Sequence, residues 1–153
     1  MQVKLKFAKC HPDAKIPTQS FGDVGFDLRS VTRVKLDPGK TTVIHVGVKV
    51  ADAIMYEGGQ IVVPFLKVEG RSSLASQGIF PVGGIIDPSY RGEIGAIMFN
   101  STAEPYVFEK GDKVAQLVCY LTFANDGEVK VIAEEAEVVG TSRGEKGFGS
   151  TGR

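Results

Sequence analysis

The chain has 153 residues, 42% of them hydrophobic, and its 18 basic side chains balance 18 acidic ones. This length suits one well-filled domain rather than two. The zero net charge excludes a global field that would attract nucleic acid or an anionic membrane. No apolar run approaches the roughly 20 residues of a membrane span, and nothing resembles a signal peptide. We therefore expect no direct nucleic-acid or membrane partner, and a protein of the cytoplasm or nucleus (the host-cell interior if viral) that is not secreted.

Alternation of apolar and polar residues dominates the sequence and predicts β-strands. It runs from Val3 to Phe7 and from Ile44 to Val50, the period of a strand with one buried face. The run 61–68 is nearly all apolar, as in a strand covered on both sides, although Pro64 favours an edge or a bulge there. Further strands are expected at 94–99 and 114–121.

Turn signals separate these strands. They are Asp37-Pro38-Gly39, Gly58-Gly59, Asp87-Pro88-Ser89, Lys110-Gly111-Asp112 and Asn125-Asp126-Gly127. The best helix candidate is short, Ser72–Gln77, where a serine could cap one or two turns. Many short strands at regular spacing predict an all-β sandwich or barrel, and we expect a single-domain jelly roll over residues 1–139.

Two segments in the first half break the strand pattern. In Gly22–Leu28, Gly25 permits an unusual backbone angle, and the lone Asp27 could simply be a solvated residue of a strand face. In Gly70–Ala75 an arginine and two serines open the candidate helix, whose free N–H groups suit an anion. Simple N-capping explains the second segment equally well.

Two further segments follow. Gly83–Gly92 places the carboxylate of Asp87 and the phenol of Tyr90 three residues apart at a tight turn, which alone reads as a hairpin loop. In the segment 110–117, Gln116 interrupts an apolar strand, so it either faces solvent or has a designated partner.

The last fourteen residues, Gly140–Arg153, contain five glycines and cannot supply a core. They also carry cations, hydroxyls and the ring of Phe148, which together suit a polyphosphate and a nucleobase. The alternative is a frayed, solvated terminus.

In order and spacing, these five segments resemble the motifs of the trimeric dUTP pyrophosphatases (dUTPases). The resemblance implies a β jelly roll, a closed three-fold homotrimer with shared active sites, and a flexible lid formed by residues 140–153. It implies Mg²⁺-dependent hydrolysis of dUTP to dUMP and pyrophosphate by attack of water at the α-phosphorus. That reaction limits uracil incorporation into DNA and supplies dUMP for thymidylate synthesis.

The resemblance also implies individual roles. Asp87 matches the general base and Tyr90 the residue that packs under the deoxyribose. Asp27 matches the carboxylate that holds Mg²⁺ through water, and Asp112 the partner that orients Arg71. The residues expected to bind the remaining parts of the substrate are Arg71, Ser72, Ser73, Gly84, Ile86, Gln116, Arg143, Phe148, Gly149, Ser150 and Thr151.

Two alternatives use the same scaffold. The string Gly70–Ala75 also resembles the dCTP deaminases, but those enzymes need an acid on the next strand, and Ile94–Phe99 contains none. A non-catalytic nucleotide sensor would be marked by loss of the general base, whereas Asp87 is present. Outside the motifs, Cys119 is expected to be a buried, inert thiol, and His11 and His45 surface residues.

Overall fold

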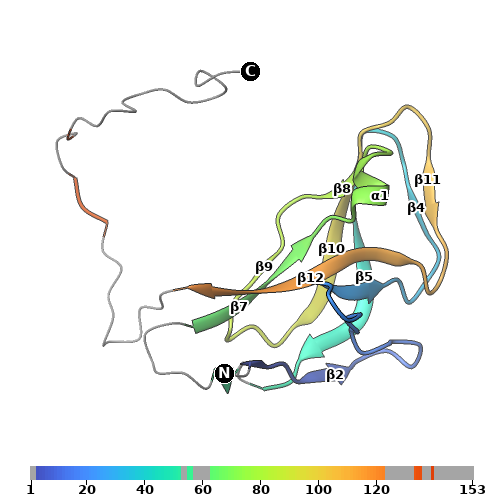
Figure 1. Cartoon of the computed structure of the whole chain (residues 1–153). Helices are drawn as coiled ribbons and strands as arrows, with labels where there is room; N and C mark the ends of the chain where they lie inside the picture. Colours follow the sequence, from blue (N-terminus) through green and yellow to red (C-terminus); the bar gives the residue numbers. More distant parts are fainter. Residues whose placement is uncertain (1–2, 53–54, 57–62, 123–132, 136–138, 140–153) are drawn as a thin grey trace.

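The computed structural model describes residues 3–52, 55–56, 63–122, 133–135 and 139. Two antiparallel four-stranded sheets dominate this part of the chain (Figure 1). In spatial order the first consists of β2 (Phe7–Lys9), β5 (Thr41–Val50), β10 (Glu93–Asn100) and β8 (Ile79–Pro81). The second consists of β3 (Phe26–Arg29), β12 (Lys113–Thr122), β7 (Val63–Glu69) and β9 (Ile85–Ile86).

Smaller elements complete the described structure. Two two-stranded sheets are formed by β1 (Val3–Lys4) with β6 (Met55–Tyr56), and by β4 (Val34–Leu36) with β11 (Tyr106–Phe108). The helix α1 (Ser72–Ala75) has only four residues. The prediction of an all-β jelly roll is therefore confirmed. No helix in the described residues is long and apolar enough to cross a bilayer.

One core lies between the two large sheets, whose strands run at a steep angle to each other in Figure 1. Side chains from both sheets are fully buried in it, among them Ile44 and Val48 of β5, Leu66 of β7 and Leu117 of β12. Burying apolar area is the dominant favourable term in folding, so this core holds the segments that carry the candidate site.

The predicted strands agree with the structure except in detail. The alternating residues of β5 are buried as expected, whereas the alternation at Val3–Phe7 is divided between β1 and β2. In β7, Pro64, Leu66 and Val68 are buried and the residues between them are half-buried, so the prediction of a strand covered on both faces is wrong. Pro64 does lie outside the short pairing with β9, the edge-like position expected for a proline.

A bulge interrupts the pairing of β12 with β3, and it positions the candidate site. Lys113 pairs with Arg29 and Ala115 with Leu28, so two steps along β12 match one step along β3. Val114 and the next residue are consequently both buried, and Gln116 then pairs with Asp27.

None of the cysteines and histidines is fully buried, although Cys119 packs against the core. Cys10 is exposed, whereas Cys119 is half-buried rather than buried, and burial raises the pKa of its thiol. His45 is exposed, as predicted, and its Nδ1 lies 3.1 Å from Glu93 Oε2. His11 is half-buried.

Candidate functional site

A polar pocket of about 240 Å³ lies where β3, β12 and the start of α1 meet. It brings together three of the segments that broke the strand pattern, although they are far apart in the sequence. Its lining residues are Asp23, Val24, Gly25, Asp27, Arg71, Ser72, Ser73, Lys113 and Gln116.

Asp27 is held by two cations in this pocket. Its Oδ1 lies 2.5 Å from Arg71 Nη1 and its Oδ2 lies 2.7 Å from Lys113 Nζ, with 20% of the side chain exposed. Burial raises the pKa of Asp27, but the hydrogen bonds and charges of Lys113 and Arg71 outweigh burial and hold that pKa below its usual value. The interpretation of Asp27 as a solvated surface carboxylate is therefore wrong.

Gln116 has the designated partner that its place in an apolar strand suggested. Its Nε2 donates to the carbonyl oxygen of Gly70 at 2.8 Å, which ties β12 to the segment just before α1. Gly25 provides the space for this arrangement, since a Cβ at Gly25 would overlap the Gln116 side chain. Gly25 does not have a positive φ, so the predicted reason for this glycine was wrong: space, not backbone angle, requires it.

The two serines of α1 do not cap the helix. Arg71 occupies the N-cap position with an extended backbone, and no side chain caps the helix by a hydrogen bond. The predicted serine cap is therefore wrong. Ser72 and Ser73 are exposed and line the polar pocket, where their hydroxyl groups can face a ligand.

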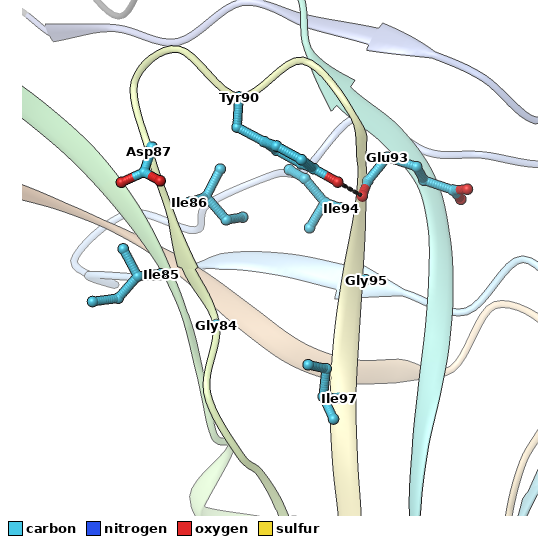
Figure 2. A pocket seen from close by; sticks show the side chains of 9 residues that line it. All are labelled: Gly84, Ile85, Ile86, Asp87, Tyr90, Glu93, Ile94, Gly95 and Ile97. Carbon is cyan, nitrogen blue, oxygen red and sulfur yellow. Dashed lines mark hydrogen bonds between the residues drawn. The ribbon is translucent and has the colours of Figure 1, made fainter.

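A second pocket, of about 210 Å³, lies between the β9 turn and β10 (Figure 2). Its lining residues are Gly84, Ile85, Ile86, Asp87, Tyr90, Glu93, Ile94, Gly95 and Ile97. Figure 2 shows Ile86 and Ile94 between the two chain segments, and the Asp87 carboxylate beside the turn, pointing away from the tyrosine ring. This pocket combines an apolar interior with one exposed carboxylate.

Tyr90 is fixed by its neighbours in sequence. The turn that carries it is closed by a 3.0 Å hydrogen bond from the N–H of Tyr90 to the carbonyl of Asp87. The Tyr90 hydroxyl donates to the carbonyl oxygen of Glu93 at 3.2 Å (Figure 2). The ring of Tyr90 therefore lies close to Gly92. A Cβ at Gly92 would overlap the ring, which makes this glycine part of the pocket's construction.

The hairpin before the turn approaches β7 closely. Gly84 has a φ of +112°, and a Cβ there would meet the side chain of Val68 at 2.9 Å. The N–H of Val68 donates to the carbonyl of Gly84 at 2.8 Å. Only glycine fits this backbone angle and this spacing.

The structure does not bring all the predicted residues into one cavity. Asp87 and Tyr90 line one pocket, whereas Arg71 and Gln116 line the other. Nor does Asp112 contact Arg71 within the described chain. Its carboxylate accepts the N–H of Glu109 at 2.8 Å, and Arg71 pairs with Asp27 instead. The tail residues Arg143, Phe148, Gly149, Ser150 and Thr151 lie outside the described residues.

Sequence reasoning missed Lys113, Gly92 and Glu93. Lys113 lies next to Asp112 in a segment already singled out. The bulge that directs Lys113 toward Asp27 cannot be recognised from the sequence. The Glu93 carboxylate accepts the N–H of Gly47 at 2.9 Å, and Figure 2 shows it pointing away from Tyr90. The sequence signal that could have identified Gly92 is its position two residues after Tyr90.

The known proteins that are similar to this chain, reported in this paragraph and the next, all carry the same enzyme name or its synonym. A family model described as dUTPase matches residues 13–152. The deoxyuridine 5'-triphosphate nucleotidohydrolase of Clostridium novyi is 38% identical over 154 residues, covering 98% of this chain and 99% of that protein. The Staphylococcus bacteriophage 80alpha dUTPase with dUpNHpp superposes with a TM-score of 0.72 at 26% identity, covering 98% of this chain and 99% of that one.

A second solved structure, at lower identity, supports the fold alone. It is a mutant dUTPase from phage phi11 of S. aureus that coordinates a structural Mg(II) ion. Its TM-score is 0.68 at 22% identity, and the match covers 88% of this chain and 99% of that one.

Proposed function

The chain belongs to the dUTPase family, and we propose that its two pockets are parts of one dUTP site completed between copies of the chain. It is a deoxyuridine 5'-triphosphate nucleotidohydrolase, which converts dUTP and water into dUMP and pyrophosphate. The observation that carries the proposed site is the polar pocket, because three distant segments place cations, hydroxyls and an amide around one small space.

The polar pocket suits the triphosphate. The guanidinium of Arg71 matches the geometry of phosphate oxygens and can bind them in bidentate fashion. The hydroxyls of Ser72 and Ser73 and the amide of Gln116 add neutral donors beside it.

The second pocket suits the deoxyuridine. Backbone groups of Gly84 and Ile86 are proposed to pair with the uracil edge, and the Tyr90 ring to pack under the sugar where a 2′-hydroxyl would clash. A single methyl clash is worth only about 1–3 kcal/mol, so rejection of thymine depends on the close packing of the Gly84 backbone against Val68. Cytosine is easier to reject, because its reversed donors leave buried groups unpaired.

Asp87 is proposed to act as the general base. As the water oxygen bonds to the α-phosphorus, the carboxylate takes the water's proton, and the bond to the bridging oxygen breaks so that pyrophosphate leaves. Positioned general bases typically contribute about 10²–10⁴-fold to the rate. Arg71 stabilises the charge that accumulates on the phosphate oxygens.

The residues of the polar pocket fit Mg²⁺ bound largely by water and phosphate. The described residues contain no cluster of three metal-ligating side chains, so a complete protein cage is not formed there. Mg²⁺ keeps several waters and commonly uses one or two carboxylates plus substrate phosphates, and Asp27 supplies such a carboxylate. When bound, the ion would neutralise charge on the triphosphate.

Assembly would bring the two pockets together. A closed three-fold homotrimer uses one contact repeated around a ring, so the Asp87 pocket of one copy can face the Arg71 pocket of the next. Residues 140–153 are proposed to cover the bound nucleotide, with Arg143, Ser150 and Thr151 on the phosphates and Phe148 and Gly149 at the base. Such a cover would exclude all but the reacting water.

A substrate panel and one substitution test this proposal. With Mg²⁺ and dUTP, dCTP, dTTP or UTP, we expect pyrophosphate from dUTP alone, and ammonia release from dCTP would indicate a deaminase instead. Asp87→Asn should still bind dUpNHpp but lose about 10²–10⁴-fold in kcat. Asp37→Asn, which alters an exposed aspartate paired with Lys35, is the matched control and should retain full activity. Full turnover by Asp87→Asn would remove this residue from the role of base.

A further inference from the structure

Lys113 lies within the polar pocket, although the regular period of a strand would place it elsewhere. Lys113 and Gln116 are three residues apart, so in an unbroken strand they would face opposite sides. The bulge in β12 removes this difference, and both residues then pair with β3 residues of one face, Arg29 and Asp27. The ammonium group of Lys113 reaches Asp27 Oδ2 at 2.7 Å.

The charges of the pocket balance in the absence of a ligand. Arg71 and Lys113 supply two positive charges, and Asp23 and Asp27 supply two negative ones. Both carboxylate oxygens of Asp27 are engaged, one by each cation. A divalent ion that approached Asp27 alone would therefore meet a neutralised carboxylate and a nearby ammonium charge.

We propose that Lys113 is a further substrate-binding residue, which neutralises Asp27 while the pocket is empty and transfers to a phosphate oxygen when dUTP binds. The transfer releases Asp27 to the metal's water shell as the nucleotide arrives, so metal and triphosphate bind as one unit. This inference rests on the proposed function of the same pocket.

The side chain of Lys113 suits such an exchange. It ends in a compact charge on a flexible stem, and 38% of it is exposed, so it can change partners without disturbing the core. The triphosphate brings more negative charge than Asp27 offers, so the exchange gains in electrostatic energy. Arg71 can move toward the phosphates at the same time.

Removing the charge of Lys113 should change two affinities in opposite directions. In Lys113→Met, which keeps an unbranched apolar stem, Mn²⁺ as a probe for Mg²⁺ should bind the nucleotide-free protein more tightly. One charge roughly 6 Å from a divalent ion is worth about tenfold in affinity even at the dielectric constant of water, which sets the expected gain before salt screening. The affinity for dUpNHpp in the presence of Mg²⁺ should fall by a similar factor.

The experiment measures Mn²⁺ binding by loss of the free-ion EPR signal and dUpNHpp binding by calorimetry, on the full-length protein. Lys113→Arg should restore both affinities, and Lys35→Met, which breaks an exposed ion pair outside the pocket, should change neither. Unchanged or weaker Mn²⁺ binding by folded Lys113→Met would overturn the inference, as would unchanged dUpNHpp binding. If Lys113→Met fails to fold, Lys113→Gln provides the same comparison. Wild-type turnover of dUTP is measured in parallel, so failure of the proposed function appears there and not in the variants.

Discussion

Replacing Gly92 with alanine should separate the stability of the fold from the construction of the Asp87 pocket. Gly92 does not have a positive φ, so alanine fits the backbone, but its Cβ would overlap the hydroxyl end of the Tyr90 ring. Tyr90 is 46% exposed, and its ring must move outward. Wild-type packing covers about half of a tyrosine, roughly 100 Å². At about 25 cal/mol per Å², complete displacement would cost about 2.5 kcal/mol.

Other contributions are smaller. The hydrogen bond from Tyr90 to the Glu93 carbonyl would be lost, but the displaced hydroxyl can bond to water. Alanine also lowers the conformational entropy of the unfolded chain, which stabilises the folded protein by about 0.4–1 kcal/mol relative to glycine. We therefore expect a net loss of about 1–2 kcal/mol in the free energy of unfolding. Because the ring then leaves the proposed sugar position, the preference for dUTP over UTP in kcat/KM should fall by about tenfold or more.

A double-mutant cycle tests the cause. In a Tyr90→Ala background there is no ring to displace, so Gly92→Ala should become stabilising by about 0.4–1 kcal/mol. Urea unfolding of the four proteins measures each step, and steady-state kinetics with dUTP and UTP measures selectivity. An equal destabilisation by Gly92→Ala in both backgrounds would refute the overlap with Tyr90 as its cause.

The remaining predictions concern the polar pocket and the C-terminal segment. Gly25→Ala should displace Gln116 and break its 2.8 Å hydrogen bond to Gly70, lowering the free energy of unfolding by about 1–3 kcal/mol and raising KM for dUTP. The folded-state pKa of Asp27 is lowered from 3.8, so its contribution to stability is present above about pH 4 and is lost as the pH falls through the folded value. Asp27→Asn should therefore reduce the dependence of unfolding on pH below 4, and an unchanged acid transition would count against the ion pairs. Removal of residues 140–153 should abolish turnover while far-UV circular dichroism of the β core stays the same, whereas full activity would exclude a lid.

The sequence was sufficient for the class of fold because one-sided burial imposes a period of two, as in β5. It was insufficient wherever the ladder departs from that period. The bulge at Val114 cannot be read from an apolar run, so the direction of Lys113 could not be predicted. Gly25 could be singled out, but its reason is a contact with a residue of another strand.

The candidate site likewise has features that the sequence could predict and features that it could not. The order of the motifs identified the chemical groups of the site, because residue types and their spacing can be read directly from the sequence. The partners of those groups depend on tertiary packing, which is why Asp27 and not Asp112 holds Arg71. Residue spacing could likewise not predict that these groups lie in two separate pockets.

The bulge in β12 links the number of residues between the Asp112 turn and Gln116 to the direction in which the side chains there point. If the ladder straightened at unchanged chain length, Lys113 and Gln116 would face opposite sides, whereas deleting the extra residue as well would leave them two apart and on one face again. In a straight ladder of unchanged length, either the ammonium group or the amide would enter the hydrophobic interior. The bulge and its extra residue therefore belong together, since the pocket keeps both side chains only when both features are present or both are absent.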